Sequence, residues 1–227
     1  MADDGNAPES GPPAGAPAGG APSSGPLLSL LASGLELWIR QQCDAVESLE
    51  LQLHGSALQL LRGRLEGVTL LARRVVFNAL EIELMELRSE AIQVQVGNLL
   101  KGKALQLDHP FLVRGQAAFT GEGLSRSLAA PQWRSLGDQL AETLLGLSPL
   151  QDLRIVRDSL VLAAQASVDH QRVELETRPR AVDGDLEIQA LQGDHRYRLP
   201  GDPNIRIEAA NLEGGMLQLH GEARVSP

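Results

Sequence analysis

Leucines alternate with polar residues in two short stretches that lie far apart in the chain. In LELQLHG, residues 49–55, the leucines occupy odd positions, and MLQLHG, residues 216–221, repeats the pattern and ends in the same His-Gly pair. Successive side chains of a β-strand point to opposite faces of a sheet, so each stretch predicts a strand with one apolar face. His54 and His220 fall out of phase with the leucines, and we expect both on the polar face, exposed to solvent.

The same alternation continues through most of the chain. Four strands joined by short turns are expected between residues 49 and 96, which predicts an antiparallel meander. In ALEIELMELR, residues 79–88, the apolar positions shift from even to odd, a change that a β-bulge would produce. A further strand is expected around residues 111–119, and six more follow Pro149. The total is nine to eleven strands.

Three segments instead have the 3.6-residue period of a helix. The first covers residues 26–43, begins with a proline suited to a first helical position, and could either cover the sheet, which we favour, or lie on a membrane interface. The other two form a pair in the middle of the chain, one capped by Thr120 and one ending at Gly146. The apolar stripes are Leu27, Leu31, Leu35 and Trp38 in the first helix, Leu124 and Leu128 in the second, and Leu136, Leu140 and Leu144 in the third.

These elements predict an α+β fold. We expect a long, curved, mostly antiparallel β-sheet wrapped around the N-terminal helix, together with the middle helical pair. The apolar face of such a sheet has to be covered. Two or three helices over so many strands would leave an elongated apolar groove or cavity, whereas a sheet that curls on itself would enclose a dry core.

The first residues differ in composition from the rest. Eighteen of the first 26 residues are Ala, Gly or Pro, which predicts a disordered tail over residues 1–25 and one domain over residues 26–227. The tail lacks the basic start and the apolar stretch of a secretory signal. No run of about 18 apolar residues follows it, so no transmembrane segment is predicted. We therefore expect the protein on the cytoplasmic side, with peripheral contact to a membrane as one option.

Candidate catalytic and metal-binding residues are few. The five histidines are scattered singly, whereas a zinc site needs three or four ligands, commonly at short spacing. The single cysteine, Cys43, has only Arg40 as a basic neighbour and is expected to be an inert, packed thiol. The phosphate-loop, nucleophile-elbow and HExxH motifs do not occur in the sequence. We therefore predict neither an enzyme nor a cofactor nor a metal site.

The charge distribution narrows the choice of partner. The net charge is −9 and only six residues are aromatic, so a nucleic-acid partner is not expected. One local exception is a basic segment, residues 62–74, with four arginines and a single acid. In it Arg62 and Arg64 could hold a lipid phosphate, because the guanidinium fork suits that geometry. The alternative is that they are ordinary surface arginines.

Three features carry a resemblance to a known family. They are the G-R-L-x-x-V turn at Gly63–Val68, the strand pair VFNALEIELMELRSEAI at residues 76–92, and the run from strand into helix at Phe119–Leu128. With these features the chain resembles the LmeA-type phospholipid-binding family, particularly its cyanobacterial members, over residues 26–227. The resemblance implies a fold similar to tubular lipid-binding proteins, with a long antiparallel sheet around a helix and an elongated apolar cavity. It offers no headgroup motif that transfers residue by residue.

The pattern and the resemblance together predict a non-enzymatic protein that binds the acyl chains of a phospholipid or glycolipid between helix and sheet, and could transfer or present them. One rival is a protein-interaction scaffold with a dry core. A second rival, an enzyme acting on a lipid, would need a polar cluster inside the groove. The residues expected to line the groove are Leu31, Leu35, Trp38, Leu51, Leu53, Ile82, Ile92, Val94, Ile207 and Leu219, and the headgroup candidates are Arg62 and Arg64.

Overall fold

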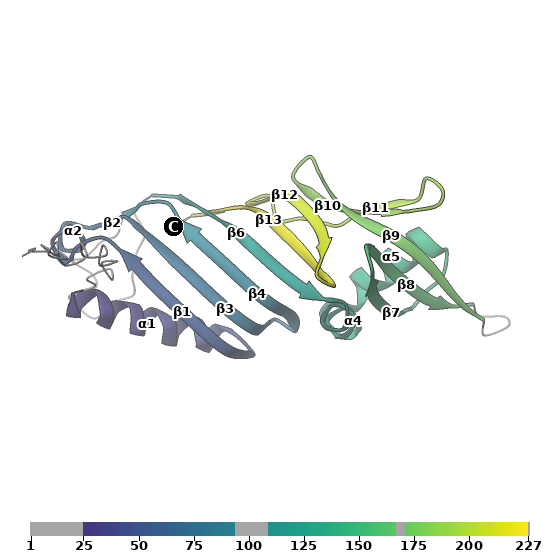
Figure 1. Cartoon of the computed structure of the whole chain (residues 1–227), viewed down its shortest axis with the longest axis horizontal. Coiled ribbons are helices and arrows are strands. Elements are labelled where there is room, and N and C mark those ends of the chain that lie inside the picture. The colour runs from purple at the N-terminus through teal and green to yellow at the C-terminus, as the bar shows by residue number, and fades with distance from the viewer. Residues whose placement is uncertain (1–24, 94–108, 167–170, 227) are drawn as a thin grey trace, which may run out of the picture.

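The computed structural model describes residues 25–93, 109–166 and 171–226. The predicted tail lies outside these residues except for Gly25, and so does Val94 among the predicted lining residues. Figure 1 shows an elongated molecule, with α1 (Pro26–Gln42) and one sheet at one end, and a second sheet with two further helices at the other.

Six strands form the first sheet, in the order β1-β3-β4-β6-β13-β12, and all neighbouring strands are antiparallel. The predicted antiparallel meander is confirmed for β1, β3 and β4. A separate pair of short strands, β2 (Arg64–Leu65) and β5 (Ile92–Gln93), lies beside a short helix, α2 (Ala57–Leu61). The strands of the first sheet are β1 (Ala45–His54), β3 (Gly67–Phe77), β4 (Leu80–Ser89), β6 (Phe111–Thr120), β12 (Ile205–Glu213) and β13 (Met216–Val225).

The alternation of the sequence gives this sheet one apolar face, which we call the inner face. Across the first three strands Leu51 pairs with Leu70, and Leu70 pairs with Leu87. Further along, Ala117 of β6 pairs with Leu219 of β13. These side chains all point to the side that α1 covers at its β1 edge, so the leucines mark the inner face as predicted.

The shift of apolar positions within β4 is present, but its predicted cause, a β-bulge, is wrong. Arg73 pairs with Leu84 and Val75 pairs with Ile82, so the register is the same on both sides of the shift and no residue is inserted. Instead Arg74 has φ 47°, in the left-handed region, which reverses the alternation of the strand there. As a result Val75 is turned into the core.

Five strands form the second sheet, in the order β11-β10-β9-β8-β7, so the strands do not form the single long sheet that was predicted. This sheet is inserted in the chain between β6 and β12. Thr120 ends β6 directly before α4 (Gly121–Ala129), and Gly121 packs so closely on β7 that a Cβ there would lie 2.7 Å from the Ile155 nitrogen. The strands are β7 (Leu150–Val156), β8 (Ser159–Gln165), β9 (Arg172–Val182), β10 (Asp185–Ala190) and β11 (Arg196–Arg198).

The three predicted helices are confirmed, with their caps. α1 begins at Pro26, and α4 (Gly121–Ala129) is capped by Thr120, whose Oγ1 accepts a hydrogen bond from the Gly123 nitrogen at 3.0 Å. α5 (Arg134–Leu145) ends at Gly146, which has φ 68°. A further helix, α2 (Ala57–Leu61), was not predicted.

Candidate functional site

An apolar cavity of about 240 Å³, which we call the first cavity, lies between α1, α2 and the inner face of the first sheet. One wall comes from the apolar stripe of α1, and the opposite wall from strands β1, β3, β4 and β6. Leu60 of α2 and Ile92 of β5 close the end. The lining residues are Leu31, Leu35, Trp38, Ile39, Leu51, Leu60, Leu65, Val68, Leu70, Leu87, Ser89, Ile92, Phe111 and Val113.

The two helices are held at this cavity by buried leucines and by hydrogen bonds, among them one from the edge of β1 to α1. Leu28 of α1 and Leu60 of α2 are each 1% exposed and pack in one cluster with Leu53. The Leu51 nitrogen at the free edge of β1 donates to the Glu36 carboxylate of α1 at 2.9 Å, which satisfies a strand-edge donor. α1 therefore stands over the edge of the sheet and leaves a gap beneath Leu31 and Leu35.

The first cavity offers almost only hydrocarbon surface among its described lining residues. Apart from the indole N–H of Trp38, a side chain that is 58% exposed, its one polar side-chain group is the Ser89 hydroxyl, which is buried and already used twice. The Ser89 Oγ accepts from the Val68 nitrogen at 2.8 Å and donates to the Glu90 carbonyl at 2.9 Å. Such a lining suits an apolar ligand, because a polar ligand group buried there would lose its hydrogen bonds to water without gaining new ones.

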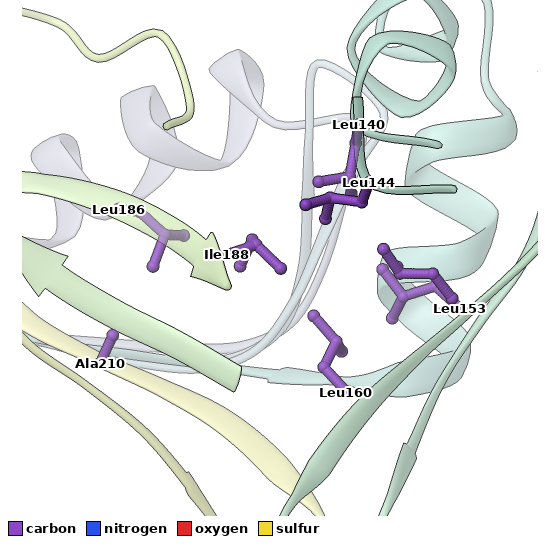
Figure 2. Close-up of a cluster of buried hydrophobic side chains, with 8 residues drawn as sticks. Leu140, Leu144, Leu153, Leu160, Leu186, Ile188 and Ala210 are labelled. Atoms are coloured by element: carbon purple, nitrogen blue, oxygen red, sulfur yellow. The ribbon is translucent and has the colours of Figure 1, made fainter. Parts of the chain in front are cut away.

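A second apolar cavity, of about 220 Å³, lies at the other end of the molecule between α4, α5 and the two sheets. Figure 2 shows part of its wall, with Leu140 of α5, Leu153 of β7, Leu160 of β8 and Ile188 of β10 gathered around a common centre. Leu219 of β13 lines the same cavity. The second sheet and the middle helices thus build a second apolar site together with the neighbouring part of the first sheet.

The polar side chains of the second cavity also have partners. The Trp133 indole nitrogen donates to the Asn78 carbonyl at 2.7 Å, and the Tyr197 hydroxyl donates to the Gln139 side-chain oxygen at 3.3 Å. Burial raises the pKa of Tyr197 above its ordinary value, so the phenol stays protonated at neutral pH and remains a donor. These contacts tie α5 to β11 and to the β3–β4 turn.

A third cluster of buried side chains, which we call the central cluster, lies on the inner face between the two cavities. It contains Ile82, Val75 and Phe119. Leu70, a lining residue of the first cavity, and Leu219, a lining residue of the second, both pack against it. Apolar side chains therefore continue along the inner face from one cavity to the other.

The structure divides the predicted lining residues between these sites. Leu31, Leu35, Trp38, Leu51 and Ile92 come together in the first cavity, whereas Leu219 lines the second. The other three described residues pack without lining either cavity: Leu53 beside Leu28 and Leu60, Ile82 in the central cluster, and Ile207 against the leucine cluster that forms part of the wall of the second cavity.

The headgroup candidates lie beside the first cavity. Arg62 follows α2 and Arg64 lies in β2, between the lining residues Leu60 and Leu65. Both arginines are exposed, and neither forms an ion pair within the described residues. α2, and with it Leu60, was not predicted from the sequence. Its signal was Ser56 followed by Gln59, which form a capping box with the Gln59 nitrogen 3.2 Å from the Ser56 hydroxyl.

The two histidines lie on the outer face, as predicted, but both are half-buried rather than exposed. His54 Nε2 lies 2.7 Å from the Thr69 hydroxyl. His220 lines a wide, open hollow beside Glu86, Arg88 and Arg114, where charges of both signs mix. Within the described ranges no three His, Cys, Asp or Glu side chains gather closely enough to hold a metal ion.

Cys43 caps the C-terminal end of α1 and packs against the central cluster. Burial and the neighbouring Asp44 raise the pKa of its thiol above the ordinary value. A raised pKa lowers the fraction of thiolate, which is the reactive form. The packing agrees with the inert thiol that the sequence predicts.

Comparison with known proteins points to one family. A family model described as LmeA-like phospholipid-binding matches residues 24–222, a range that includes every described residue of both cavities. No match was found among curated proteins or among solved structures. Among the helices described, none is both long enough and apolar enough to cross a bilayer.

Proposed function

The chain belongs to the LmeA-like phospholipid-binding family, and we propose that it holds an acyl chain of a phospholipid in the first cavity without changing the lipid chemically. The observation that carries this proposal is the cavity itself. Its lining is hydrocarbon apart from the Ser89 hydroxyl, which is occupied, and the indole N–H of Trp38. A site of this kind recognises an alkyl chain through exclusion of water and not through directed bonds.

The expected affinity suits a protein that takes up lipid and releases it again. Each buried methylene contributes about 0.8 kcal/mol, so ten of them would contribute roughly 8 kcal/mol before ordering costs. That corresponds to a dissociation constant of about 1 µM or weaker once the cost of ordering is included. Leucine side chains fix no register along the chain, so acyl groups of different length would be accepted.

The size of the first cavity suggests where the rest of the chain lies. Its 240 Å³ lies below the range of about 300–1,000 Å³ that is common for ligand pockets, so a long acyl chain would extend beyond it. We propose that longer chains continue over the central cluster toward the second cavity, so that the two cavities are parts of one apolar trough. Leu70 and Leu219, which join the cavities to the central cluster, support this.

Arg62 and Arg64 are the proposed contacts of the phosphate. They flank the first cavity, they are exposed, and no described carboxylate neutralises them. A phosphate near the mouth of the cavity could therefore be met by two guanidinium groups while its acyl chain extends inward. Transfer between membranes, and a location on the cytoplasmic side, stay predictions.

Native mass spectrometry of gently purified protein, with extraction and identification of lipid from the same sample, tests the proposal. We expect a mass excess equal to a phospholipid on the wild type. Leu51→Glu places a charge on the cavity wall and should abolish the excess, whereas Gln52→Glu, on the opposite face of β1, should retain it.

Because a buried charge can unfold a protein, Leu31→Trp serves as a second variant that fills the cavity without adding charge. It should lower lipid occupancy while the circular dichroism spectrum stays that of the wild type. A wild-type protein that carries no lipid, and takes none from vesicles or from detergent micelles, would contradict the proposal and favour a scaffold whose apolar face is filled by its own side chains.

A further inference from the structure

Large apolar side chains are exposed mainly at the end of the molecule that carries the first cavity. Among the described residues nine such side chains are exposed, and five of them belong to α1 and α2. The exposed fractions are 72% for Leu30, 59% for Leu37 and 58% for Trp38 in α1, and 58% for Leu58 and 54% for Leu61 in α2. Short helices that expose leucine and tryptophan are typical of surfaces that insert into a membrane interface.

The exposed stripe of α1 is continuous with the wall of the first cavity. At helical spacing Leu30, Gly34, Leu37 and Trp38 share one side, and Trp38 also lines the cavity. Glu36 and Arg40 lie on the other side, where Glu36 binds the edge of β1. A surface that binds the exposed stripe would therefore also reach the first cavity, at Trp38.

The charges beside the stripe indicate which surface covers it. Although the chain as a whole carries −9, the exposed cations Arg62 and Arg64 follow directly on Leu61, without a described carboxylate partner. Leucines flanked by unpaired arginines complement a bilayer that contains anionic lipid, because the apolar groups enter the acyl boundary while the arginines meet phosphate.

We propose that α1 and α2 form a membrane-docking face, in which Leu30, Leu37, Trp38, Leu58 and Leu61 enter the interface of a lipid bilayer and Arg62 and Arg64 contact anionic headgroups. This inference rests on the proposed function, since docking places the mouth of the first cavity against the lipid that is to be taken up. A lipid chain then passes beside Trp38 from the bilayer into the cavity without crossing water.

Flotation with vesicles tests docking directly. The full chain should float with vesicles of phosphatidylcholine and phosphatidylglycerol, and less with pure phosphatidylcholine. Leu30→Ser with Leu37→Ser should lower the partition coefficient about tenfold or more, because two exposed leucines lose their contact with the acyl boundary. The matched control is Leu191→Ser with Ile205→Ser, which removes two exposed apolar side chains that lie outside α1 and α2 and should leave flotation unchanged.

Fluorescence locates the contact at one side chain. The chain has two tryptophans, so Trp133→Phe leaves Trp38 as the single reporter. Brominated phospholipids should quench Trp38 in this variant, and the emission should shift to shorter wavelength with vesicles. The inference would be overturned if Trp38 were not quenched, or if the Leu30→Ser/Leu37→Ser variant floated as well as the wild type. It would also be overturned if the wild type were a dimer that does not bind vesicles and that these two substitutions dissociate.

Loading from two sources separates this inference from the proposed function. If docking is correct, the Leu30→Ser/Leu37→Ser protein takes up lipid from vesicles more slowly than the wild type. From detergent micelles it takes up the same amount of lipid as the wild type. If the first cavity holds no lipid, loading fails from both sources in the wild type as well, even where Trp38 is quenched by the bilayer. Equal uptake rates from vesicles for variant and wild type would contradict docking and leave the cavity proposal standing.

Discussion

At the scale of single residues, two paired glycines mark points of close backbone approach in the first sheet. Gly115 of β6 pairs with Gly221 of β13. A Cβ at Gly115 would overlap the Glu86 carbonyl oxygen and lie 2.8 Å from the Leu87 side chain, and one at Gly221 would overlap the Arg206 carbonyl oxygen. Both positions therefore require glycine because of close backbone approach, not because of an unusual φ.

Gly115→Ala should be strongly destabilising. The added methyl group meets the backbone of β4, which cannot move aside without disturbing the ladder, so we expect the free energy of unfolding to fall by roughly 3 kcal/mol. Gly34→Ala is the control, because nothing lies within 4 Å of its Cβ position and alanine favours a helix interior by about 0.5–1 kcal/mol. Urea unfolding measures both, and a Gly115→Ala protein as stable as the wild type would show that the strands do not approach so closely.

At the scale of elements, α4 is fastened to β4 by one carboxylate. Glu81 receives two hydrogen bonds from the Arg126 guanidinium, at 2.7 and 2.6 Å, and its backbone nitrogen donates to the Ser127 hydroxyl at 2.9 Å. The bidentate bond with Arg126 lowers the pKa of Glu81 below its ordinary value. The helix that forms one wall of the second cavity is thus held to the first sheet.

This tie should make stability depend on pH in the acid range. A carboxyl with a lowered folded-state pKa stabilises the fold above its unfolded pKa, and that contribution is lost as pH falls through the folded value. Arg126→Gln should therefore lower the melting temperature at about pH 7, and the difference from the wild type should shrink by about pH 3. The effect is modest because the Glu81 side chain is 32% exposed.

Thermal unfolding at several pH values measures the difference in melting temperature between the Arg126→Gln protein and the wild type. Arg224→Gln is the matched control, because Arg224 is exposed and has no described ion pair, so its removal should lower the melting temperature little at any pH. A difference between the Arg126→Gln protein and the wild type that stays constant down to low pH would contradict the role of Glu81. The second pair that Arg126 forms, with Glu122 at 3.7 Å, is mostly exposed and adds little.

The elements that the sequence predicted correctly were those with several signals. α1, α4 and α5 each combine an apolar stripe with a terminal residue that begins or ends a helix, such as Thr120 and Gly146. α2 has five residues, which are too few to show a helical period, and its capping box was the only signal in the sequence that indicated it. The change of face at Arg74 was visible in β4, but the left-handed conformation behind it lies in β3 and has no marker in the sequence.

At the scale of the whole molecule, alternation determines which side chains share a face but not which strands pair. The return of β12 and β13 to β6 and the separate sheet of β7 to β11 could therefore not be derived from the sequence. For the same reason the predicted lining residues were divided: Leu51 and Leu219 were expected in one groove, and they lie in two cavities with the central cluster between them.

Whether a single lipid spans both cavities depends on the middle of the inner face. Ala117 lies there, half-buried, paired with Met85 on one side and Leu219 on the other. Its side chain is small, whereas a tryptophan at this position would project over the central cluster between Leu70 and Leu219. Ala117→Trp should therefore block a long chain at this point and leave the first cavity intact.

Chain length is the variable that distinguishes one trough from two separate sites. With Ala117→Trp we expect dioctanoyl-phosphatidylglycerol to bind as to the wild type, and dioleoyl-phosphatidylglycerol to bind more weakly, both measured by native mass spectrometry. Gln116→Trp places the same side chain on the outer face of the same strand and should leave both lipids unaffected. Equal loss of both lipids would mean that the substitution disturbs the fold, which circular dichroism checks. Unchanged binding of the long-chain lipid would mean that the first cavity alone holds it and that its tail turns outward past Trp38, so that the second cavity serves a different ligand or none.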